Sequence, residues 1–224
     1  MNTYLNSFIN LIYPAICTIC NQGLAKGERS ICIQCVDDFP RITNTSFVEN
    51  KFKGQINYNF AFSMYAYERN SKISRALKSL KYDQNNEIGL FLGEKLGLEL
   101  HKHNLLNDID VLIPVPVTNQ RLKKRGYNQA EIICNGIQKI SNIEIESQIL
   151  KRNSFFKSQT KLNRNLRFEN IDKVFYCDSK DLENKKILLI DDVLTTGATL
   201  ISCAEALYNK GVAEISIATI CNAI

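Results

Sequence analysis

The segment KILLIDDVLTTGATL, residues 186–200, combines residue types that could bind a phosphorylated sugar. Its aliphatic run predicts a buried strand, and Asp191 and Asp192 follow that run directly. Threonine hydroxyls and one glycine come next, before a helical pattern begins. The first amides of a helix lack backbone acceptors, so together with the helix dipole they attract a phosphate group. Carboxylates beside that site can accept hydrogen bonds from ribose hydroxyls or help to hold Mg²⁺.

An ordinary turn with a helix cap would use some of the same residue types. In that alternative, one aspartate caps a helix and the threonines form a turn. The complete spacing of acids, hydroxyls and glycine favours the binding interpretation. The sequence contains no GxxxxGK[ST] segment and no GxGxxG segment after a predicted strand, so these two nucleotide motifs are excluded.

Residues 187–199, ILLIDDVLTTGAT, resemble the signature of type I phosphoribosyltransferases. In that family the segment binds 5-phosphoribosyl 1-diphosphate (PRPP). The resemblance implies that Asp191 and Asp192 contact the ribose hydroxyls and Mg²⁺. It also implies that the 5-phosphate lies in a loop formed by Thr195, Thr196, Gly197, Ala198 and Thr199.

A second segment, residues 111–131, places a cationic loop after a predicted strand. Arginine matches phosphate geometry, whereas the neighbouring lysines alone are typical of a solvated basic face. The pattern P-V-P-x4-R-L-x2-R-G-Y-N-Q-A resembles the ComF-type, competence-associated branch of the phosphoribosyltransferases. The matching residues are Arg121, Arg125, Gly126, Asn128 and Gln129. The resemblance implies that Arg121 and Arg125 bind the diphosphate.

Two further segments resemble the same branch. Residues 150–170 follow its R-x6-Q-x4-R-x5-N pattern through Arg152, Gln159, Arg164 and Asn170. The resemblance implies a flexible loop that folds over PRPP, with Arg152, Gln159 and Arg164 as the candidates for catalysis. Shielding matters because the anomeric carbon develops oxocarbenium character, which bulk water would attack. A basic loop that contacts nothing is the alternative.

Lys81 is a weaker diphosphate candidate. LKSLKYDQN, residues 77–85, resembles an L-K-Y-x-G segment, but Asp83, Gln84 and Asn85 stand where a glycine is usual. No residue of the chain is identified as a general base.

Four of the eight cysteines form the pattern Cys17-x2-Cys20-x11-Cys32-x2-Cys35. Four thiolates suit tetrahedral zinc, although the x11 gap is shorter than in a usual zinc ribbon. Two disulfides are disfavoured in the cytosol, and a redox site needs only one CxxC. Structural zinc is therefore the favoured interpretation, and residues 11–20, LIYPAICTIC, also resemble the N-terminal part of ComF-type proteins.

Hydrophobic patterns predict the order of the elements. Strands are expected at residues 59–68, 108–116, 143–150, 173–177, 186–190 and 214–220, and helices at 5–12, 71–82, 87–103, 127–140 and 199–211. This alternation predicts an α/β, type I phosphoribosyltransferase-like domain with a mainly parallel central sheet flanked by helices. We expect an N-terminal helix and zinc module over residues 1–40, a linker over 41–57, and the phosphoribosyltransferase-like domain over 58–224.

Composition bounds the partners and the compartment. The 224 residues carry a formal net charge of +5, and two basic segments suggest an anionic partner, either a phosphorylated small molecule or nucleic acid. No apolar run reaches the length of a membrane span. The N-terminal residues lack the features of a signal peptide, so we expect a cytoplasmic protein.

Two functions remain open at the level of sequence. The first is transfer of a phosphoribosyl group from PRPP, with Mg²⁺, to an unknown acceptor, and the resemblance associates this activity with natural transformation. The second is a non-enzymatic PRPP sensor that binds single-stranded DNA or a helicase-like competence partner. Phe155, Phe156 and Phe168 lie among basic residues, an arrangement that suits single-stranded nucleic acid, but packing within the protein is the favoured role of these rings. Glutamine-dependent amidophosphoribosyl transfer is disfavoured, because no N-terminal cysteine nucleophile is present.

Overall fold

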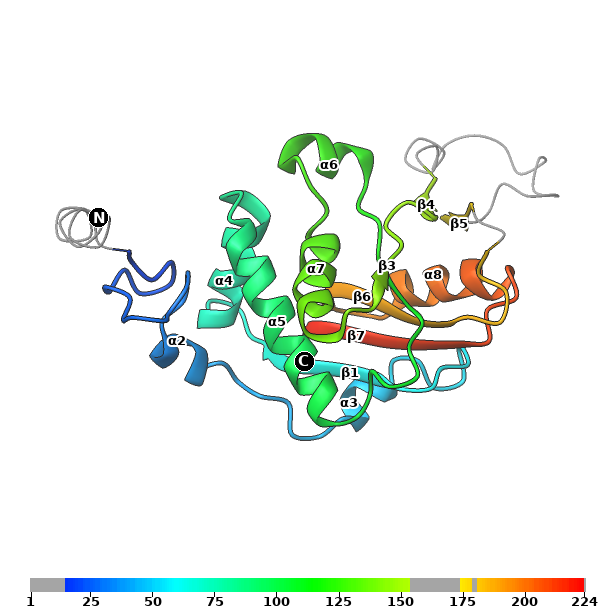
Figure 1. Ribbon diagram of the computed structural model, residues 1–224, viewed down its shortest axis with the longest axis horizontal. Coiled ribbons are helices and arrows are strands. Elements are labelled where there is room, and N and C mark those ends of the chain that lie inside the picture. Colours follow the sequence, from blue (N-terminus) through cyan, green and yellow to red (C-terminus); the bar gives the residue numbers. More distant parts are fainter. Residues whose placement is uncertain (1–14, 154–173, 179–180, 224) are drawn as a thin grey trace.

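The structure is a computed structural model that describes residues 15–153, 174–178 and 181–223. Over these residues it contains a parallel sheet of five strands in the order β1-β7-β6-β2-β3 (Figure 1). The strands are β1 (Ala61–Tyr67), β2 (Val111–Pro114), β3 (Glu144–Ile145), β6 (Lys186–Leu194) and β7 (Glu214–Ala223). The expected α/β class with a mainly parallel sheet is therefore confirmed. The helix expected at residues 5–12 lies outside the described residues.

Helices cover both faces of this sheet. The helices are α2 (Ile33–Asp37), α3 (Ser46–Glu49), α4 (Lys72–Tyr82), α5 (Asn86–Lys102), α6 (Asn119–Arg125), α7 (Gln129–Ser141) and α8 (Ala198–Tyr208). Leu188 and Ile190 of β6 pack with α4, α5 and α7, whereas Ile187 and Leu189 pack with α3 and α8. Successive strand residues point to opposite faces, so β6 joins the two halves of the core. None of the described helices is both long and apolar enough to cross a membrane.

The prediction of one strand over residues 143–150 is wrong. The chain forms β3 beside β2 in the main sheet and then β4 (Leu150–Arg152), which pairs antiparallel with β5 (Phe175–Cys177) in a separate small sheet. Polar residues 146–148 separate the two strands. Because these side chains have no place in an apolar core, the chain leaves the edge of the main sheet there.

The cationic segment expected as a loop forms helix α6 instead. The Thr118 hydroxyl caps it by accepting a hydrogen bond from the Arg121 amide at 3.2 Å. Gly126 ends the helix in the left-handed region at φ 84°. The signals for both ends of the helix, Thr118 and Gly126, are present in the sequence, but the run of positive charges between them led to the expectation of a loop.

The three glycines of α5 explain how α5 approaches α7 so closely. A Cβ atom on Gly93 of α5 would lie 2.2 Å from the Ile133 carbonyl oxygen of α7. Likewise, a Cβ atom on Gly136 of α7 would lie 2.4 Å from the Leu90 carbonyl oxygen of α5. Glycine at these positions lets the two helix backbones touch. Glycine lowers intrinsic helix stability, but here the close helix contact requires it.

Residues 41–57 contain α3 and make close contacts with the sheet. Val48 and Phe52 are fully buried in the core formed with α8. This segment therefore lies against the loop and helix α8 that follow β6.

Candidate functional site

The acidic pair lies at the carboxyl end of β6, as the sequence predicts. Asp191 and Asp192 are half-buried, and the Asp192 amide donates a hydrogen bond to Asp191 Oδ1 at 2.8 Å. The strand continues beyond them and pairs with β7 as far as Leu194. Ligands of open α/β sheets bind at this edge.

Lys81 meets the acidic pair from the last turn of α4. Its Nζ atom lies 2.6 Å from Asp192 Oδ2, and both side chains are largely shielded from solvent. Burial and the charge of Asp192 raise the pKa of Asp191 to about 7, although the Asp192 amide, Lys81 and Arg121 act in the opposite direction. The carboxylate form of Asp191 is thus disfavoured here, and a further cation or further hydrogen-bond donors would stabilise it.

The loop after β6 has the geometry of a phosphate site. Gly197 is buried at φ 84° and precedes α8, while Thr195, Thr196, Ala198 and Thr199 are exposed. The Ala198 amide donates weakly to the Thr196 hydroxyl at 3.4 Å, and no side chain caps the helix. The first amides of α8 are therefore available to an anion.

The two arginines expected at the diphosphate lie on α6. Arg121 is exposed, and its charge acts on Asp191. Arg125 donates a hydrogen bond to Gln129 Oε1 at 2.7 Å, and its guanidinium group lies 5.4 Å from the centre of the Tyr82 ring. Arg125 is thus held between the start of α7 and the end of α4.

The other residues that match the branch pattern here hold the segment in place. Asn128 caps α7 by accepting a hydrogen bond from the Ala130 amide, and it also donates to the Val115 carbonyl oxygen at 3.0 Å. The Tyr127 hydroxyl donates to the Leu80 carbonyl oxygen. These bonds fix α6 and its flanking turns against β2 and α4.

Only one of the flexible-loop candidates lies within the described residues. Arg152 ends β4, and its guanidinium group lies 5.2 Å from the centre of the Phe175 ring. Gln159, Arg164 and Asn170, together with Phe155, Phe156 and Phe168, lie outside the described residues.

The four N-terminal cysteines form a candidate metal centre. All four sulfur atoms lie within 4.8 Å of one another, and those of Cys20 and Cys32 are 3.7 Å apart. Two thiolates bound to tetrahedral zinc at about 2.3 Å would be separated by about 3.8 Å, so the spacing fits. All four thiols are free, so the alternative of two disulfides is not observed. These cysteines could hold a metal ion such as zinc.

The local hydrogen bonds favour a thiolate at Cys17. Burial acts to raise the pKa of this thiol, but the amides of Cys32, Cys20 and Ile19 outweigh it and lower the pKa to about 6. Metal ligation requires the thiolate form, so amide donors around the sulfur prepare the site for a metal.

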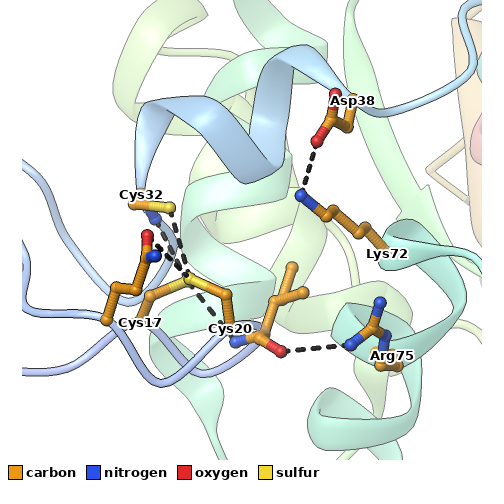
Figure 2. A network of polar contacts seen from close by, with 8 residues as sticks. Cys17, Cys20, Cys32, Asp38, Lys72 and Arg75 are labelled. Carbon is orange, nitrogen blue, oxygen red and sulfur yellow. Dashed lines mark hydrogen bonds and ion pairs between the residues drawn. The ribbon is translucent and has the colours of Figure 1, made fainter.

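The cysteine segment is docked on α4 (Figure 2). Arg75 donates to the Ile19 carbonyl oxygen at 3.3 Å, and Lys72 forms an ion pair with Asp38. Ile19 and Leu77 belong to one continuous apolar core. The cysteine segment and the sheet edge therefore share a helix, because α4 contacts the former with its first turns and carries Lys81 in its last.

Sequence reasoning missed two residues at this edge, Tyr82 and Lys51. Tyr82 is 61% exposed and contacts the cations of α6. Lys51 comes from residues 41–57 and reaches the end of β7. Tyr82 belongs to the L-K-Y pattern, which was a weak indication of a role at the site, whereas nothing in the sequence indicated Lys51.

Comparison with known proteins decides the family. The family model "Phosphoribosyl transferase domain" matches residues 99–224, which is more than half of the chain. The chain belongs to this family. The expected type I phosphoribosyltransferase fold is thereby confirmed.

Relatives place this phosphoribosyltransferase-like protein in the ComF-type branch. The chain is 26% identical to DNA utilization protein YhgH of Escherichia coli (strain K12) over 155 residues, which is 68% of each protein. It is 34% identical to Competence protein ComFC of Bacillus subtilis over 101 residues, or 45% of this chain and 39% of that protein. It is 31% identical to Competence protein F of Haemophilus influenzae over 110 residues, 48% of each. The resemblance to the ComF-type branch is confirmed.

Solved structures are more distant. The glutamine PRPP amidotransferase of B. subtilis aligns with 59% of this chain at 17% identity and a TM-score of 0.44, and the match covers 26% of that protein. A hypoxanthine phosphoribosyltransferase from Staphylococcus aureus aligns with 62% of this chain at 19% identity and a TM-score of 0.38, over 65% of its own length. Family membership therefore rests on the domain match and not on these alignments.

Proposed function

We propose that this protein binds PRPP with Mg²⁺ at the carboxyl edge of the sheet and transfers the phosphoribosyl group to an acceptor. The observation that carries this proposal is the arrangement at the end of β6. A partly buried acidic pair, with Asp191 at a raised pKa, stands one short turn before a glycine-bent loop at a helix start. Acids for a ribose and amides for a phosphate are thus adjacent.

Each group of the ligand has residues suited to it. The amides of residues 196–199 would bind the 5-phosphate, and the Asp191 and Asp192 carboxylates would accept hydrogen bonds from the ribose hydroxyls. Arg121 and Arg125 would bind the diphosphate, with Lys81 shared between the diphosphate and Asp192. Arg152 would help to shield the anomeric carbon from water, because β4 leads into the basic segment.

Mg²⁺ suits a site with surplus carboxylate charge, and Asp191 and Asp192 would help to hold it through oxygen ligands. When bound, the ion neutralises charge that develops on the departing diphosphate. In the transfer, the bond from the anomeric carbon to the diphosphate oxygen breaks and its electron pair leaves with the diphosphate. The acceptor forms the new bond to that carbon and loses a proton. The protein contributes charge and position, with no covalent step.

Calorimetry with PRPP and Mg²⁺ tests the binding. The wild-type protein should bind, and Asp191→Asn/Asp192→Asn protein should bind at least about a hundredfold more weakly, since two charge-assisted contacts are lost. Equal binding by the wild type and this variant would remove the basis of the proposal.

Turnover is tested separately, by assaying released diphosphate with candidate nucleobase and amine acceptors. Release that depends on both PRPP and one acceptor would establish a transferase. Binding without release in the presence of every acceptor would favour the sensor.

The sensor is a second candidate because of the surface beside the site. Arg121, Lys123 and Lys124 are exposed on α6, and exposed Tyr82 lies against Lys124. Cations interleaved with an aromatic ring suit single-stranded nucleic acid. The relatives' names refer to competence and to DNA utilization. On this basis we extend the association with DNA uptake, through single-stranded DNA or a helicase-like partner, to this chain.

We further propose that Cys17, Cys20, Cys32 and Cys35 hold structural zinc. The spacing of the sulfur atoms and the amide donors to Cys17 support this assignment. Reduced cysteines of this kind persist in the cytoplasm, where we place the protein. Metal analysis of the purified protein should find about one zinc ion per chain, and a Cys17→Ser/Cys35→Ser variant should contain none.

A further inference from the structure

Lys51 is a partly buried cation whose hydrogen-bond partners among the described residues are neutral. Its Nζ atom donates to Asn222 Oδ1 at 2.5 Å and to the Ala223 carbonyl oxygen at 2.7 Å, both neutral acceptors. Within the described part of the chain, no carboxylate lies at ion-pair distance from it. Lys81, the other partly buried lysine at this edge, has Asp192 beside it. Burying an unpaired charge is unfavourable, so Lys51 calls for an explanation.

Both ends of the Lys51 side chain lie at the phosphate loop. A Cβ atom placed on Gly197 would lie 3.3 Å from the Lys51 carbonyl oxygen and 3.6 Å from Lys51 Cβ. At the other end, the amine contacts Asn222, which pairs with Leu194 of β6, the residue directly before Thr195. Lys51 thus lies beside Gly197 at one end and reaches β7 next to Leu194 at the other.

The amine also has unused hydrogen-bonding capacity. An ammonium group has three N–H donors, and the contacts with Asn222 and Ala223 account for two. Burial lowers the pKa of Lys51, and a nearby anion would act in the opposite direction. A phosphate group at the start of α8 would supply both the missing acceptor and the missing counter-charge.

We infer that the Lys51 ammonium group is a further ligand for the 5-phosphate of the bound sugar phosphate. This inference rests on the proposed function, because it assigns a residue to the same site. The amides of the loop would donate directed hydrogen bonds to the phosphate. Lys51 would add a positive charge, which the exposed threonines cannot provide. Asn222, which is 1% exposed, positions the amine beside the loop.

Ribose 5-phosphate isolates this contact, since it carries the 5-phosphate but no diphosphate. Calorimetry should compare the wild type with Lys51→Gln, which keeps a hydrogen-bond donor but removes the charge. The matched control is Lys53→Gln, a neighbouring exposed lysine. We expect Lys51→Gln to weaken binding of ribose 5-phosphate at least about tenfold, the usual effect of losing one charged hydrogen bond. Lys53→Gln should bind like the wild type.

The outcomes separate the two proposals. If the wild type binds ribose 5-phosphate and Lys51→Gln binds it equally well, the role of Lys51 is wrong and the proposed function stands. If the wild type binds neither ribose 5-phosphate nor PRPP with Mg²⁺, both proposals fail.

A measurement on the wild type removes any dependence on the folding of the variant. Reductive methylation followed by mass spectrometry reports the accessibility of each lysine amine. PRPP with Mg²⁺ should protect Lys51 several-fold and leave Lys53 unchanged. Unchanged methylation of Lys51 at saturating PRPP would overturn the inference.

Discussion

At the residue scale, the site is built from charges that the fold leaves unbalanced. Asp191 and Asp192 share one half-buried edge, where Lys81 pairs with Asp192, while Lys51 has no carboxylate at ion-pair distance among the described residues. A ligand with ribose hydroxyls and a phosphate complements both. The unbalanced charges therefore match the groups of the proposed ligand.

The pKa of Asp191 gives a prediction for binding. Its free-state pKa of about 7 arises from burial and Asp192, with Lys81 and Arg121 as the opposing cations. Ribose hydroxyls and Mg²⁺ favour the carboxylate, so binding should release a proton near pH 7 and affinity should rise from pH 6 to 8. The rise cannot exceed about tenfold per pH unit for one proton.

Calorimetry in buffers of different ionisation enthalpy measures this proton release. Asp191→Asn protein is the control, since phosphate groups of the ligand also titrate in this range, near pH 6. A pH profile equal in the wild type and the control would contradict the assignment.

The folding stability of the ligand-free protein should change with pH in the opposite direction to the binding affinity. The raised pKa means that stability falls as pH rises from about 4 to 7, so Asp191→Asn should raise the melting temperature at pH 8 by a few degrees.

At the element scale, the parts that could be predicted are those in which the signal is local. β6, the turn and α8 are contiguous, so their order could be predicted from one stretch of sequence, although β6 extends to Leu194 instead of ending at residue 190. The helix expected from residue 71 begins where the Ser71 hydroxyl caps α4 by accepting a hydrogen bond from the Ser74 amide. Lys51 could not be predicted, because its role depends on contacts with residues about 170 positions away.

The glycines of α5 also have a role that depends on contacts with a distant segment and could not be predicted from the local sequence. Locally they argue against a helix, and only the contact with α7 explains them. Gly93→Ala should destabilise the protein by about 2–3 kcal/mol, because the added carbon meets backbone atoms that cannot move independently. Urea denaturation measures this, with Gly23→Ala as the control, since no atom lies within 4 Å of a Cβ there. Equal unfolding midpoints for the two variants would refute the close contact.

α4 should couple the cysteine segment to the ligand site. Its first turns contact Ile19 and Asp38, and its last turn holds Lys81 and Tyr82. With zinc on the cysteines, as proposed, a chelator should therefore lower the melting temperature by several degrees and also weaken PRPP binding, although the cysteines lie outside the proposed PRPP site. Metal-free protein with unchanged melting temperature and PRPP affinity would show that the two regions are independent.

At the scale of the whole molecule, four cations gather on α6, and the charge of one of them, Arg121, acts on Asp191 at the proposed ligand site. The net charge of +5 is modest, but α6 presents Arg121 and its neighbouring lysines beside Tyr82. The sequence indicated an anionic partner from these clusters. It could not show that the cations form a helix packed on an exposed tyrosine, because that contact joins distant segments.

Single-stranded DNA binding, if it uses this surface, should depend on salt and on α6. Neutralising Arg121 and Arg125 should reduce the slope of log affinity against log salt by about 1.4, roughly 0.7 for each lost phosphate contact. Fluorescence anisotropy across a salt series measures the slope. Lys102→Gln/Lys210→Gln, which removes two exposed cations elsewhere, should leave the slope unchanged. An equal loss in both variants would show that only net charge matters.

The most direct measurement is a crystal structure of the protein with PRPP and Mg²⁺. Our account predicts density for the 5-phosphate on the amides of residues 196–199, with Lys51 alongside, and ribose hydroxyls within hydrogen-bond distance of Asp191 and Asp192. PRPP bound elsewhere, or a loop at residues 195–199 that stays empty at saturating ligand, would contradict it.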